Sequence, residues 1–243
     1  MSSPKVSVVI CTYNQVSYIR DTVESVLAQT YQNIEIIVAD DASTDGARDV
    51  LRELEESNPD RLIVIYGDTN LGIPSNINRG LSRVSGQYVA WLDGDDLMLP
   101  QKIQLQVELL ENSPEACGCY HDATVFDSAS GREYGSFAQL YNGTKRLRQG
   151  SIHDTLVPRY FALPSTTMCR AEFVPKHGFD VRLSEFSEFL FFTDVFVNGK
   201  VLTLDQELTR YRRHDANLTA NDDFRRRSLE NELVAYAIIT ARY

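Results

Sequence analysis

Short apolar runs rich in β-branched residues alternate with segments of helical periodicity through the first half of the chain, and this alternation constrains the fold most. Each run is too short for a helix, and apolar residues in the segments between them recur every three or four positions. This rhythm is typical of a mostly parallel sheet covered by helices on both faces. The predicted strands are 6–11, 34–39, 62–66 and 88–92, and the predicted helices are 16–29, 46–57, 73–84 and 98–112.

The second half of the chain is less regular, but it contains no repeat, low-complexity tract or linker. We therefore expect one α/β domain across the 243 residues. The chain ends inside a predicted helix, which is compatible with a domain cut from a longer protein. The predicted elements are strands at 116–126, 165–170, 201–204 and 208–212, a long loop with a short helix over 128–160, and helices near 171–177, 186–198 and 223–242.

The charge balance excludes some classes of function. A net charge of −10 argues against nucleic-acid binding, which needs basic surface to neutralise phosphates. It also disfavours a polybasic membrane-binding face, although a local patch leaves a peripheral membrane contact open. No apolar run is long enough for a transmembrane segment, and the start of the chain has no signal-peptide pattern. With four cysteines and no disulfide framework, a reduced, cytoplasmic protein is the simplest interpretation.

The cysteine-rich sequence Cys117-Gly-Cys119-Tyr-His121 has two interpretations. One is a zinc site, but no second pair of nearby ligands would complete a tetrahedron. The other is a buried strand, in which the spacing of two residues places all three side chains on one face. We favour the strand.

Polar residues follow four of the predicted strands. They include an acidic group at Asp93, Asp95 and Asp96, and in an open parallel sheet ligands bind beyond these strand ends. Three carboxylates so close together repel one another unless a cation or proton intervenes, and oxygen ligands of this kind suit Mg²⁺ or Mn²⁺. No glycine-rich phosphate loop is present, so a metal would hold the phosphates of a diphosphate ligand. Helix capping is the alternative for Asp41 and for the acidic group. The other strand ends carry Thr12, Tyr13, Asn14, Asp40, Asp68 and Asn70.

Several motifs lie in order along the chain: VSVVICTYN at 6–14, IIVADDASTD at 36–45, NLG at 70–72, NRG at 78–80, YVAWLDGDD at 88–96, GFD at 178–180 and YRRH at 211–214. Together they resemble family 2 glycosyltransferases of the GT-A fold. That resemblance implies a Rossmann-like α/β domain, an inverting transfer of sugar from a nucleotide diphosphate, and a DxD motif at Asp93 and Asp95. It divides the chain into a nucleotide-binding half at 1–112, an acceptor and catalytic half at 113–222, and a C-terminal helix at 223–243.

The same resemblance implies roles for the residues of the nucleotide site. Thr12 and Tyr13 line it, with Tyr13 near the base. Asp41 accepts a hydrogen bond from the imide N–H of uracil or thymine, a group that cytosine lacks. Asp93 reaches the ribose or the sugar, and Asp95 holds Mn²⁺ or Mg²⁺ on the diphosphate.

The resemblance also suggests a general base. The family has a glutamate followed by an aspartate beyond its Gly-Phe-Asp motif, and these positions are Ser187 and Glu188 here. We assign Glu188 as the base, with Glu185 one helical turn away as the alternative. His214 matches a histidine that completes the metal site in some relatives, and a structural histidine is the other interpretation.

Basic residues offer less certain phosphate contacts. Lys145, Arg146 and Arg148 in the long loop are candidates for phosphate or anionic acceptor contacts, and a solvated charge run is the alternative. Ile77 stands where many relatives carry arginine, which weakens a phosphate contact there.

The sequence thus predicts a metal-dependent hexosyltransferase-like enzyme. Its partners would be a UDP- or dTDP-linked sugar donor and a glycan or lipid-linked acceptor, in cell-surface glycan synthesis by analogy with the family. A nucleotidyltransferase is disfavoured, because the first strand is not followed by its glycine- and arginine-rich loop. A catalytically inactive nucleotide-sugar-binding module is the alternative, favoured by Ser187 and opposed by the retained Asp41, Asp93 and Asp95.

Overall fold

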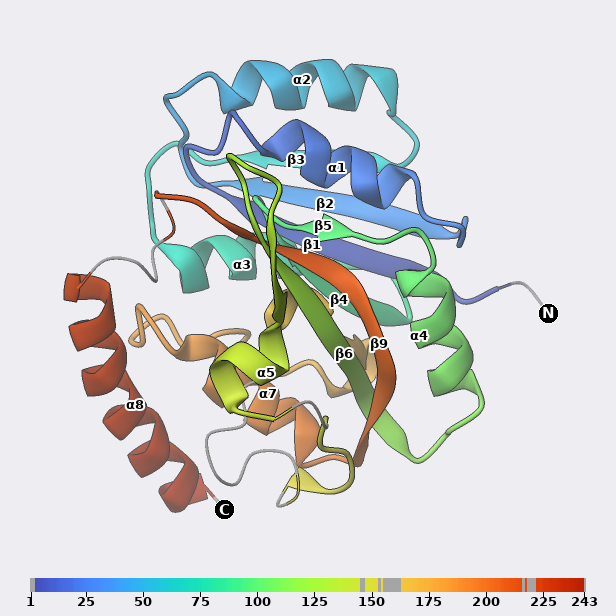
Figure 1. Cartoon of the computed structure of the whole chain (residues 1–243), viewed down its shortest axis with the longest axis vertical. Helices are drawn as coiled ribbons and strands as arrows, with labels where there is room; N and C mark the ends of the chain where they lie inside the picture. The colour runs from blue at the N-terminus through green and yellow to red at the C-terminus, as the bar shows by residue number, and fades with distance from the viewer. Residues whose placement is uncertain are drawn as a thin grey trace.

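One mixed sheet with helices on both faces forms the molecule (Figure 1). The computed structural model describes residues 3–144, 147–152, 154, 163–215, 217 and 222–242. Its strands are β1 Val6–Thr12, β2 Ile34–Asp40, β3 Leu62–Tyr66, β4 Tyr88–Asp93, β5 Leu97–Met98, β6 Ala116–Asp127, β7 Glu133–Ser136, β8 Met168–Arg170 and β9 Lys200–Arg213. Its helices are α1 Ile19–Leu27, α2 Ala47–Ser57, α3 Ile73–Leu81, α4 Lys102–Glu111, α5 Phe137–Asn142, α7 Ser187–Phe196 and α8 Asp222–Arg242, with 3-10 turns η1 Pro164–Thr166 and η2 Ala171–Phe173.

The first four predicted strands pair in parallel, as expected. β1 lies between β2 and β4, and β3 pairs with β2. All seven residues of β2 are buried, because helices cover both faces of the sheet. The carboxyl ends of these strands, at Thr12, Asp40, Tyr66 and Asp93, therefore meet at one edge of the sheet.

The two faces of the sheet carry different helices. Helices α1, α2 and α4 pack on one face in a core cluster that includes Val8, Ile10 and Ile36. Helices α3 and α7 pack on the other face around Val9 and Trp91. The alternation of consecutive β1 residues between the two clusters follows from the two-residue period of a strand.

In the second half of the sheet both orientations occur. β8 pairs antiparallel with β4 and β6, and β6 pairs parallel with β9. The two strands predicted at 201–204 and 208–212 are one strand, β9, since Glu207 between them pairs with Asp122 and the pairing with β6 continues on both sides through register shifts. The complete order is β3-β2-β1-β4-β8-β6-β9-β5, with β7 paired to β6 outside this path.

The helix predicted near 171–177 is wrong in extent. Only the single 3-10 turn η2 forms there. Val174 has ψ 123°, an extended conformation, because it precedes Pro175 and a residue before proline is sterically disfavoured in the helical region.

The Cys117–His121 segment is part of β6, and all three side chains in question are buried. The expectation that they share one face is wrong. Cys117 lies in the cluster under α7 and Cys119 in the cluster under α4, because a register shift between Ala116 and Gly118 breaks the alternation. All four cysteines of the chain are free.

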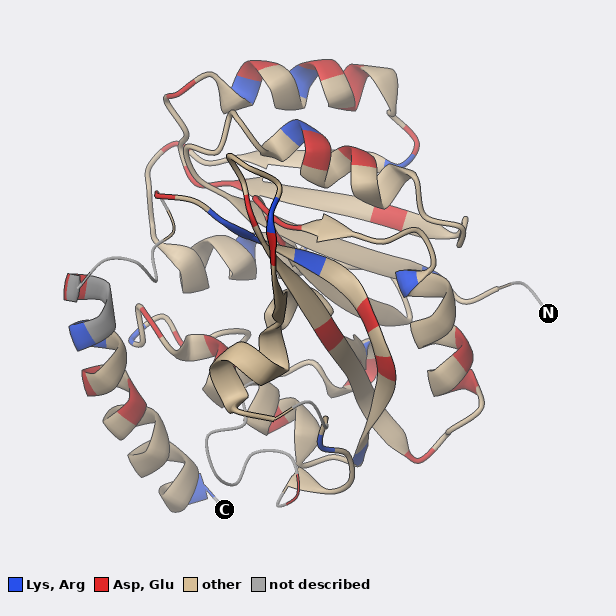
Figure 2. Ribbon diagram, in the orientation of Figure 1, with Lys and Arg blue, Asp and Glu red and all other residues tan. Residues whose placement is uncertain are grey.

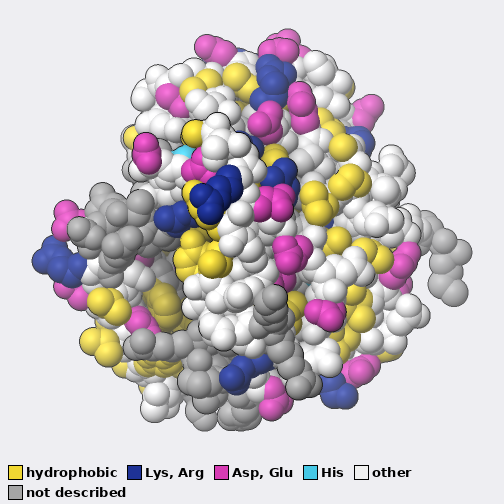
Figure 3. Space-filling view, viewed as in Figure 1, with side chains coloured by type: hydrophobic (Ala, Val, Ile, Leu, Met, Phe, Trp, Pro, Cys, Tyr) yellow, Lys and Arg dark blue, Asp and Glu magenta, His cyan; other side chains and the backbone are white. Residues whose placement is uncertain are grey.

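Helix α8 packs beside α7 through both ion pairs and apolar contacts. The Nε of Arg227 lies 2.7 Å from a carboxylate oxygen of Glu185. Ala235 packs in a small apolar cluster with Leu183 and Leu190. Apolar side chains of α8, such as Leu233 at 73% exposure, remain open to solvent. Figure 3 shows hydrophobic side chains at its lower left, where α8 lies. Among the described residues, no helix is both long and apolar enough to cross a bilayer.

Lys102 on α4 is fully buried, and the nearest polar partner of its ammonium group is the sulfur of Met98 at 3.8 Å. Burial lowers its pKa to about 7. The same burial, with the Lys102 charge nearby, lowers the pKa of His121 to about 3. These pKa values indicate that burying Lys102 on α4 and His121 on β6 in their charged forms is energetically unfavourable.

We predict that Lys102→Met stabilises the fold. Because the pKa of Lys102 is about 7 in the folded chain and its ordinary value is 10.5, the energetic cost of burying Lys102 is absent above about pH 10.5. It grows as the pH falls to about 7 and is constant below that. Replacement with methionine should raise the free energy of unfolding at pH 7 by roughly 1–3 kcal/mol and flatten its rise between pH 7 and 9. Urea unfolding at several pH values measures this. The exposed Lys176→Met is the control, and an equal effect of both changes would contradict the prediction.

Candidate functional site

The candidate site lies where β1, β2 and β4 end, beside the far end of β9. Acidic residues (red) and basic residues (blue) lie close together around these strand ends in Figure 2. The N–H of Asp41 donates to the Thr12 carbonyl at 3.0 Å, and the N–H of Gly94 donates to the Cys11 carbonyl at 3.0 Å. These bonds tie the segments after β1, β2 and β4 into one surface.

Residues 93–96 form a tight turn that depends on Gly94. The N–H of Asp96 donates to the Asp93 carbonyl at 3.0 Å. A Cβ on Gly94 would lie 2.3 Å from the Gln15 side-chain oxygen and 2.8 Å from the Cys11 carbonyl. Only glycine allows the backbone of this turn to lie so close to β1. Gly94 therefore holds the carboxylates on either side of it next to the end of β1.

The carboxylates of this turn perturb one another. Burial raises the pKa of Asp93 to about 7, with further contributions from the negative charges of Asp95 and Glu188. Burial, together with the charges of Asp95 and Asp93, raises the pKa of Asp96 well above its usual range. Paired carboxylates with separated pKa values are typical of functional sites.

Asp96 is a buried structural anchor of the turn. Its Oδ1 accepts the backbone N–H of Arg212 at 3.0 Å. Its Oδ2 is buried and has no hydrogen-bond partner among the described residues. Neither Asp95 nor Asp96 caps α4, which begins at Lys102 after the cap residue Gln101.

Arg212 of β9 is the cation that faces this turn. Its Nε donates to the Asp95 carbonyl at 2.7 Å, and its guanidinium lies 5.0 Å from the centre of the Tyr18 ring. It also reaches the Asp21 carboxylate at 3.4 Å. With 7% of its surface exposed, Arg212 is poorly screened by water and partly offsets the negative charge of the turn.

Asp95 and His214 are the residues whose side chains could hold a cation. His214 Nε2 lies 2.9 Å from Asp95 Oδ2, and its ring stacks on Tyr18 with a centroid distance of 4.4 Å. Its backbone N–H donates to the Asn217 side chain at 2.6 Å, which helps to fix the residue. Two neighbouring ligands of an octahedral ion are about 3 Å apart when each is about 2.1 Å from the metal, so this pair suits Mg²⁺ or Mn²⁺. Among the described residues no three acidic, histidine or cysteine side chains converge on such a position, so phosphate oxygens would have to complete it.

Asp41 lies at the same edge and is held by backbone donors. Its two carboxylate oxygens accept the N–H groups of Leu71 at 2.9 Å and Gly72 at 2.8 Å, and Arg79 lies 3.6 Å away. Asp41 therefore fixes the turn before α3 and does not cap α2, whose cap residue Gly46 makes no side-chain bond.

Thr12 and Tyr13 differ in exposure. Thr12 is buried and its hydroxyl bonds the Gln15 side chain at 2.9 Å, whereas Tyr13 is 47% exposed. The Tyr13 ring is therefore accessible to a ligand. Thr12 instead packs closely against the backbone of Gly94.

Glu188 begins the first turn of α7 and is partly buried. Burial raises its pKa above the usual range, with a further contribution from Glu185. Glu185 is already engaged, because it pairs with Arg227 and accepts a hydrogen bond from Asn231 at 3.1 Å. Of the two glutamates, Glu188 is the one whose charge acts on Asp93.

Backbone strain accompanies the predicted site residues. Among the described residues, Asn14, Ala42 and Phe186 are the non-glycine positions with positive φ. Asn14 follows Tyr13, Ala42 follows Asp41, and Phe186 directly precedes α7. Such conformations are costly and often occur at functional sites.

Sequence reasoning missed several residues that support the site. Tyr18, Arg212 and Asn217 were not assigned roles, although the motif at 211–214 includes Arg212. Ser165 was also missed, and its hydroxyl accepts the backbone N–H of Asp93 at 3.0 Å. No signal in the local sequence pattern marks Ser165. It lies beside the end of β4 because the next strand, β8, pairs antiparallel with β4.

The long loop carries the basic residues that the sequence suggests as phosphate contacts. Lys145 and Arg146 lie outside the described residues. The backbone N–H of Arg148 donates to the Tyr120 hydroxyl at 2.9 Å, which places that residue against β6. Ile77 packs against the cluster under α7, as an apolar residue should.

Comparison with known proteins identifies the family of this chain. Residues 7–166 match the family model described as "Glycosyl transferase family 2". The putative teichuronic acid biosynthesis glycosyltransferase TuaG of Bacillus subtilis is 43% identical over 107 residues, which are 44% of this chain and 42% of TuaG. The matches span 38% to 42% of the first three curated relatives.

Solved structures share the fold. TarS of S. aureus (residues 1–349), in complex with UDP, has a TM-score of 0.71 at 21% identity over 86% of this chain and 60% of that one. The mannosyltransferase PcManGT of Pyrobaculum calidifontis, in complex with GDP-Man and Mn²⁺, has a TM-score of 0.71 at 18% identity over 99% of this chain and 65% of that one. At these identities the likeness establishes the GT-A fold.

We predict that Arg212→Lys loosens the 93–96 turn. Lysine keeps the charge but cannot direct a planar donor to the Asp95 carbonyl, so the free energy of unfolding should fall by about 1–3 kcal/mol. Urea unfolding measures the loss. Arg210→Lys is the matched control on the same strand. Arg210 pairs with the exposed Glu133, and its replacement should cost under about 1 kcal/mol. Equal losses in the two variants would contradict a special role for Arg212.

Proposed function

The chain belongs to glycosyl transferase family 2, and from this premise we propose that it is an inverting, metal-dependent transferase. It would transfer a sugar from a UDP- or dTDP-linked donor to an acceptor hydroxyl. The observation that supports this most is the acidic turn at the end of β4, where Asp95 Oδ2 lies 2.9 Å from His214 Nε2. The charges of Asp95 and of Glu188 on α7 also raise the pKa of Asp93 there, in addition to burial.

The donor would lie along the edge formed by β1, β2 and β4. Tyr13 packs against the base, Asp41 accepts the imide N–H, and Asp93 binds the ribose or sugar. TarS has been solved with UDP-GlcNAc and PcManGT with GDP-Man, so the fold itself does not set the base. The preference for uracil or thymine rests on Asp41, and the residues of 1–112 form the nucleotide-binding half.

Asp95 and His214 would hold the metal, together with oxygens of the diphosphate. A bound Mn²⁺ or Mg²⁺ would offset the negative charge that develops on the leaving diphosphate. The complex of PcManGT, which has the same fold, with Mn²⁺ supports a divalent metal, and the choice of Asp95 and His214 rests on their geometry. Arg212 keeps the 93–96 turn in place through the Asp95 carbonyl.

Glu188 would act as general base. Its carboxylate takes the proton of the acceptor hydroxyl as that oxygen bonds to the anomeric carbon. The bond from that carbon to the diphosphate oxygen breaks, the nucleoside diphosphate leaves, and the configuration inverts. Residues 113–222 form the acceptor and catalytic half, with α8 packed against it.

The acceptor would be a glycan or lipid-linked glycan of the cell surface. TuaG, a putative teichuronic acid biosynthesis enzyme, supports this setting. The free cysteines suit a cytoplasmic enzyme, and that location stays a prediction.

A thermal-shift comparison of UDP, dTDP, CDP and GDP, with Mn²⁺ and with EDTA, tests the donor assignment. A ligand that binds only the folded state at about 100 times its Kd stabilises it by about 2.7 kcal/mol. We expect manganese-dependent stabilisation by UDP or dTDP and little by CDP or GDP. Equal shifts with UDP and CDP would refute the role of Asp41.

Asp95→Asn should remove the manganese-dependent part of the UDP shift, because an amide is a much poorer ligand for a hard cation. Asp49→Asn, an exposed change of the same charge on α2, should leave the shift intact. A full manganese-dependent shift in Asp95→Asn would place the metal elsewhere.

Glu188→Gln should leave UDP binding intact and slow sugar transfer by about 10²–10⁴-fold, the range for a lost general base. Glu185→Gln should keep transfer within about tenfold of the wild-type rate, since this residue holds α8. Because burial raises the pKa of Glu188, wild-type kcat/KM should be retained above that pKa. It should fall as the pH drops through it, at a higher pH than for an exposed glutamate. Wild-type turnover in Glu188→Gln would move the role to Glu185, and donor binding without any turnover in the wild type would indicate an inactive module.

A further inference from the structure

Three aromatic rings from α5 and β9 form a corner on the molecular surface. Phe137 and Tyr141, one helical turn apart on α5, have ring centroids 4.5 Å apart and planes tilted by 33°. The ring of Tyr211 on β9 is nearly perpendicular to both. Its plane makes an angle of 79° with the Phe137 ring and 82° with the Tyr141 ring, and the centroid distances are 5.5 and 6.4 Å. We call these three rings the aromatic corner, and its rings present two faces nearly at right angles.

The aromatic corner is not part of a buried core. Tyr141 is 50% exposed and its neighbour Leu140 is 47% exposed, while Phe137 and Tyr211 are partly buried. The Tyr141 hydroxyl makes no hydrogen bond to the described part of the chain. Exposure of apolar surface to water is energetically unfavourable, and an exposed apolar patch often marks a ligand-binding surface.

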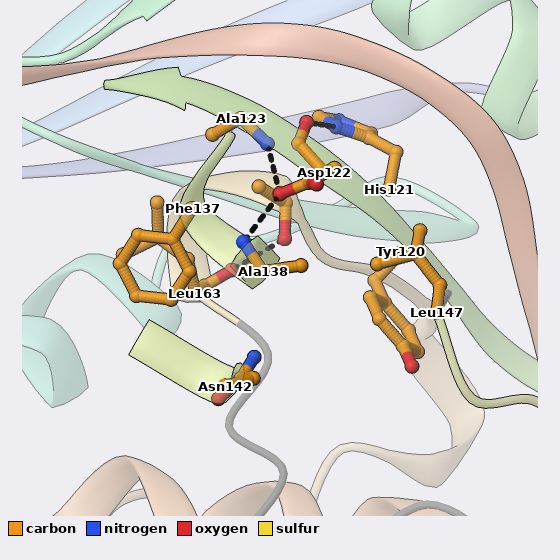
Figure 4. Close-up of a pocket in the computed structure, with 10 residues that line it drawn as sticks. Tyr120, His121, Asp122, Ala123, Phe137, Ala138, Asn142, Leu147 and Leu163 are labelled. Carbon is orange, nitrogen blue, oxygen red and sulfur yellow. Dashed lines mark hydrogen bonds between the residues drawn. The ribbon is translucent and has the colours of Figure 1, made fainter. Parts of the chain in front are cut away.

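A small hollow adjoins the aromatic corner, with room for about one water-sized group, and the two share Phe137 (Figure 4). Tyr120, which packs with α7 in the core, lines the same hollow. The hollow therefore lies on the face of the sheet that carries α7 and Glu188. Other lining residues include Leu163 and Thr166.

The hollow is next to the proposed catalytic centre. Leu163 and Thr166 flank Ser165, whose hydroxyl accepts the backbone N–H of Asp93 at 3.0 Å. Since adjacent Cα atoms are about 3.8 Å apart, these lining residues lie within roughly 8 Å of Ser165 along the chain. An occupant of the hollow and the aromatic corner would thus approach Asp93 from the side opposite α1.

Asp122 gives the hollow a hydrogen-bond acceptor. Its Oδ1 accepts the N–H groups of Ala123 at 2.8 Å and Ala138 at 2.9 Å, which fix the carboxylate at the start of α5 (Figure 4). Its Oδ2 receives no hydrogen bond from the described residues. A carboxylate in this position can accept hydroxyl groups, and it repels an anionic ligand.

We propose that the aromatic corner binds a neutral pyranose ring of the acceptor, with one hydroxyl group of that ring in the hollow, so that the acceptor is a glycan at its reactive end. The C–H groups on one face of a pyranose are slightly positive and stack on the negative face of an aromatic ring. The hydroxyl groups at its rim donate to Asp122. A lipid chain would leave the Asp122 oxygen desolvated without a donor, and a polyol phosphate would meet its negative charge. The proposal rests on the proposed function, because it assigns the second substrate of the same reaction.

Saturation-transfer NMR on the full chain tests the proposal with methyl β-glycosides of glucose, galactose, mannose and N-acetylglucosamine. Ribitol, which has no ring face, is the control ligand. We expect saturation at the axial ring hydrogens of at least one glycoside and none at ribitol. Tyr141→Ala should weaken glycoside binding by roughly 3- to 10-fold, whereas Tyr141→Phe keeps the ring and should bind as the wild type does.

Tyr134→Ala is the matched control variant, because Tyr134 is 48% exposed on β7 outside the aromatic corner. It should leave glycoside binding unchanged. Binding of no glycoside, equal saturation of ribitol, or equal binding by the wild type and Tyr141→Ala would overturn the proposal. The manganese-dependent UDP shift reports on the proposed function separately. Its absence alongside intact glycoside binding would refute the transferase donor site and leave the sugar site standing.

Discussion

Repulsion among carboxylates at the end of β4 is the constraint on which the rest of the site depends. Asp93, Asp95 and Asp96 lie within four consecutive positions, and the charge of Glu188 on α7 also acts on Asp93. The fold offsets this repulsion in part. Asp96 receives a backbone N–H, and Arg212 places one buried cation against the Asp95 carbonyl. Burial is the main cause of the raised pKa values of Asp93 and Asp96, and the charges of neighbouring carboxylates raise them further, so the repulsion is only partly offset.

The topology of the sheet brings these charged residues together with the residues that partly neutralise them. Parallel pairing brings the ends of β1, β2 and β4 together, and Gly94 allows the 93–96 turn to approach β1 closely. The long strand β9 then crosses from the second half and delivers Arg212 and His214 to the same turn. We propose that the donor lies along this edge of the sheet and that the acceptor lies in the space bordered by α7 and α5.

Much of this arrangement could be predicted from the sequence where the signal is local. The apolar runs and helical periodicities located β1 to β4 and α1 to α4, and the acidic group after β4 located the centre of the site. Long-range contacts were harder to predict. Ser165 reaches Asp93 only because β8 returns antiparallel to β4, and no local pattern encodes that pairing. Register shifts in β6 separated Cys117 from Cys119 for a similar reason, since a bulge leaves no clear mark in the alternation of residues. The roles of Asp41, Glu188 and His214 came from resemblance to the family, and their chemistry stays a prediction.

Anomalous diffraction from a crystal of the chain soaked with Mn²⁺ and UDP tests the central claim most directly. The account expects one manganese peak within about 2.5 Å of the Asp95 carboxylate, bridged to the diphosphate, with the uracil ring facing Asp41. His214 at the same ion would complete the protein ligands. UDP bound with its manganese away from Asp95, or bound at this edge with no manganese at all, would contradict the account.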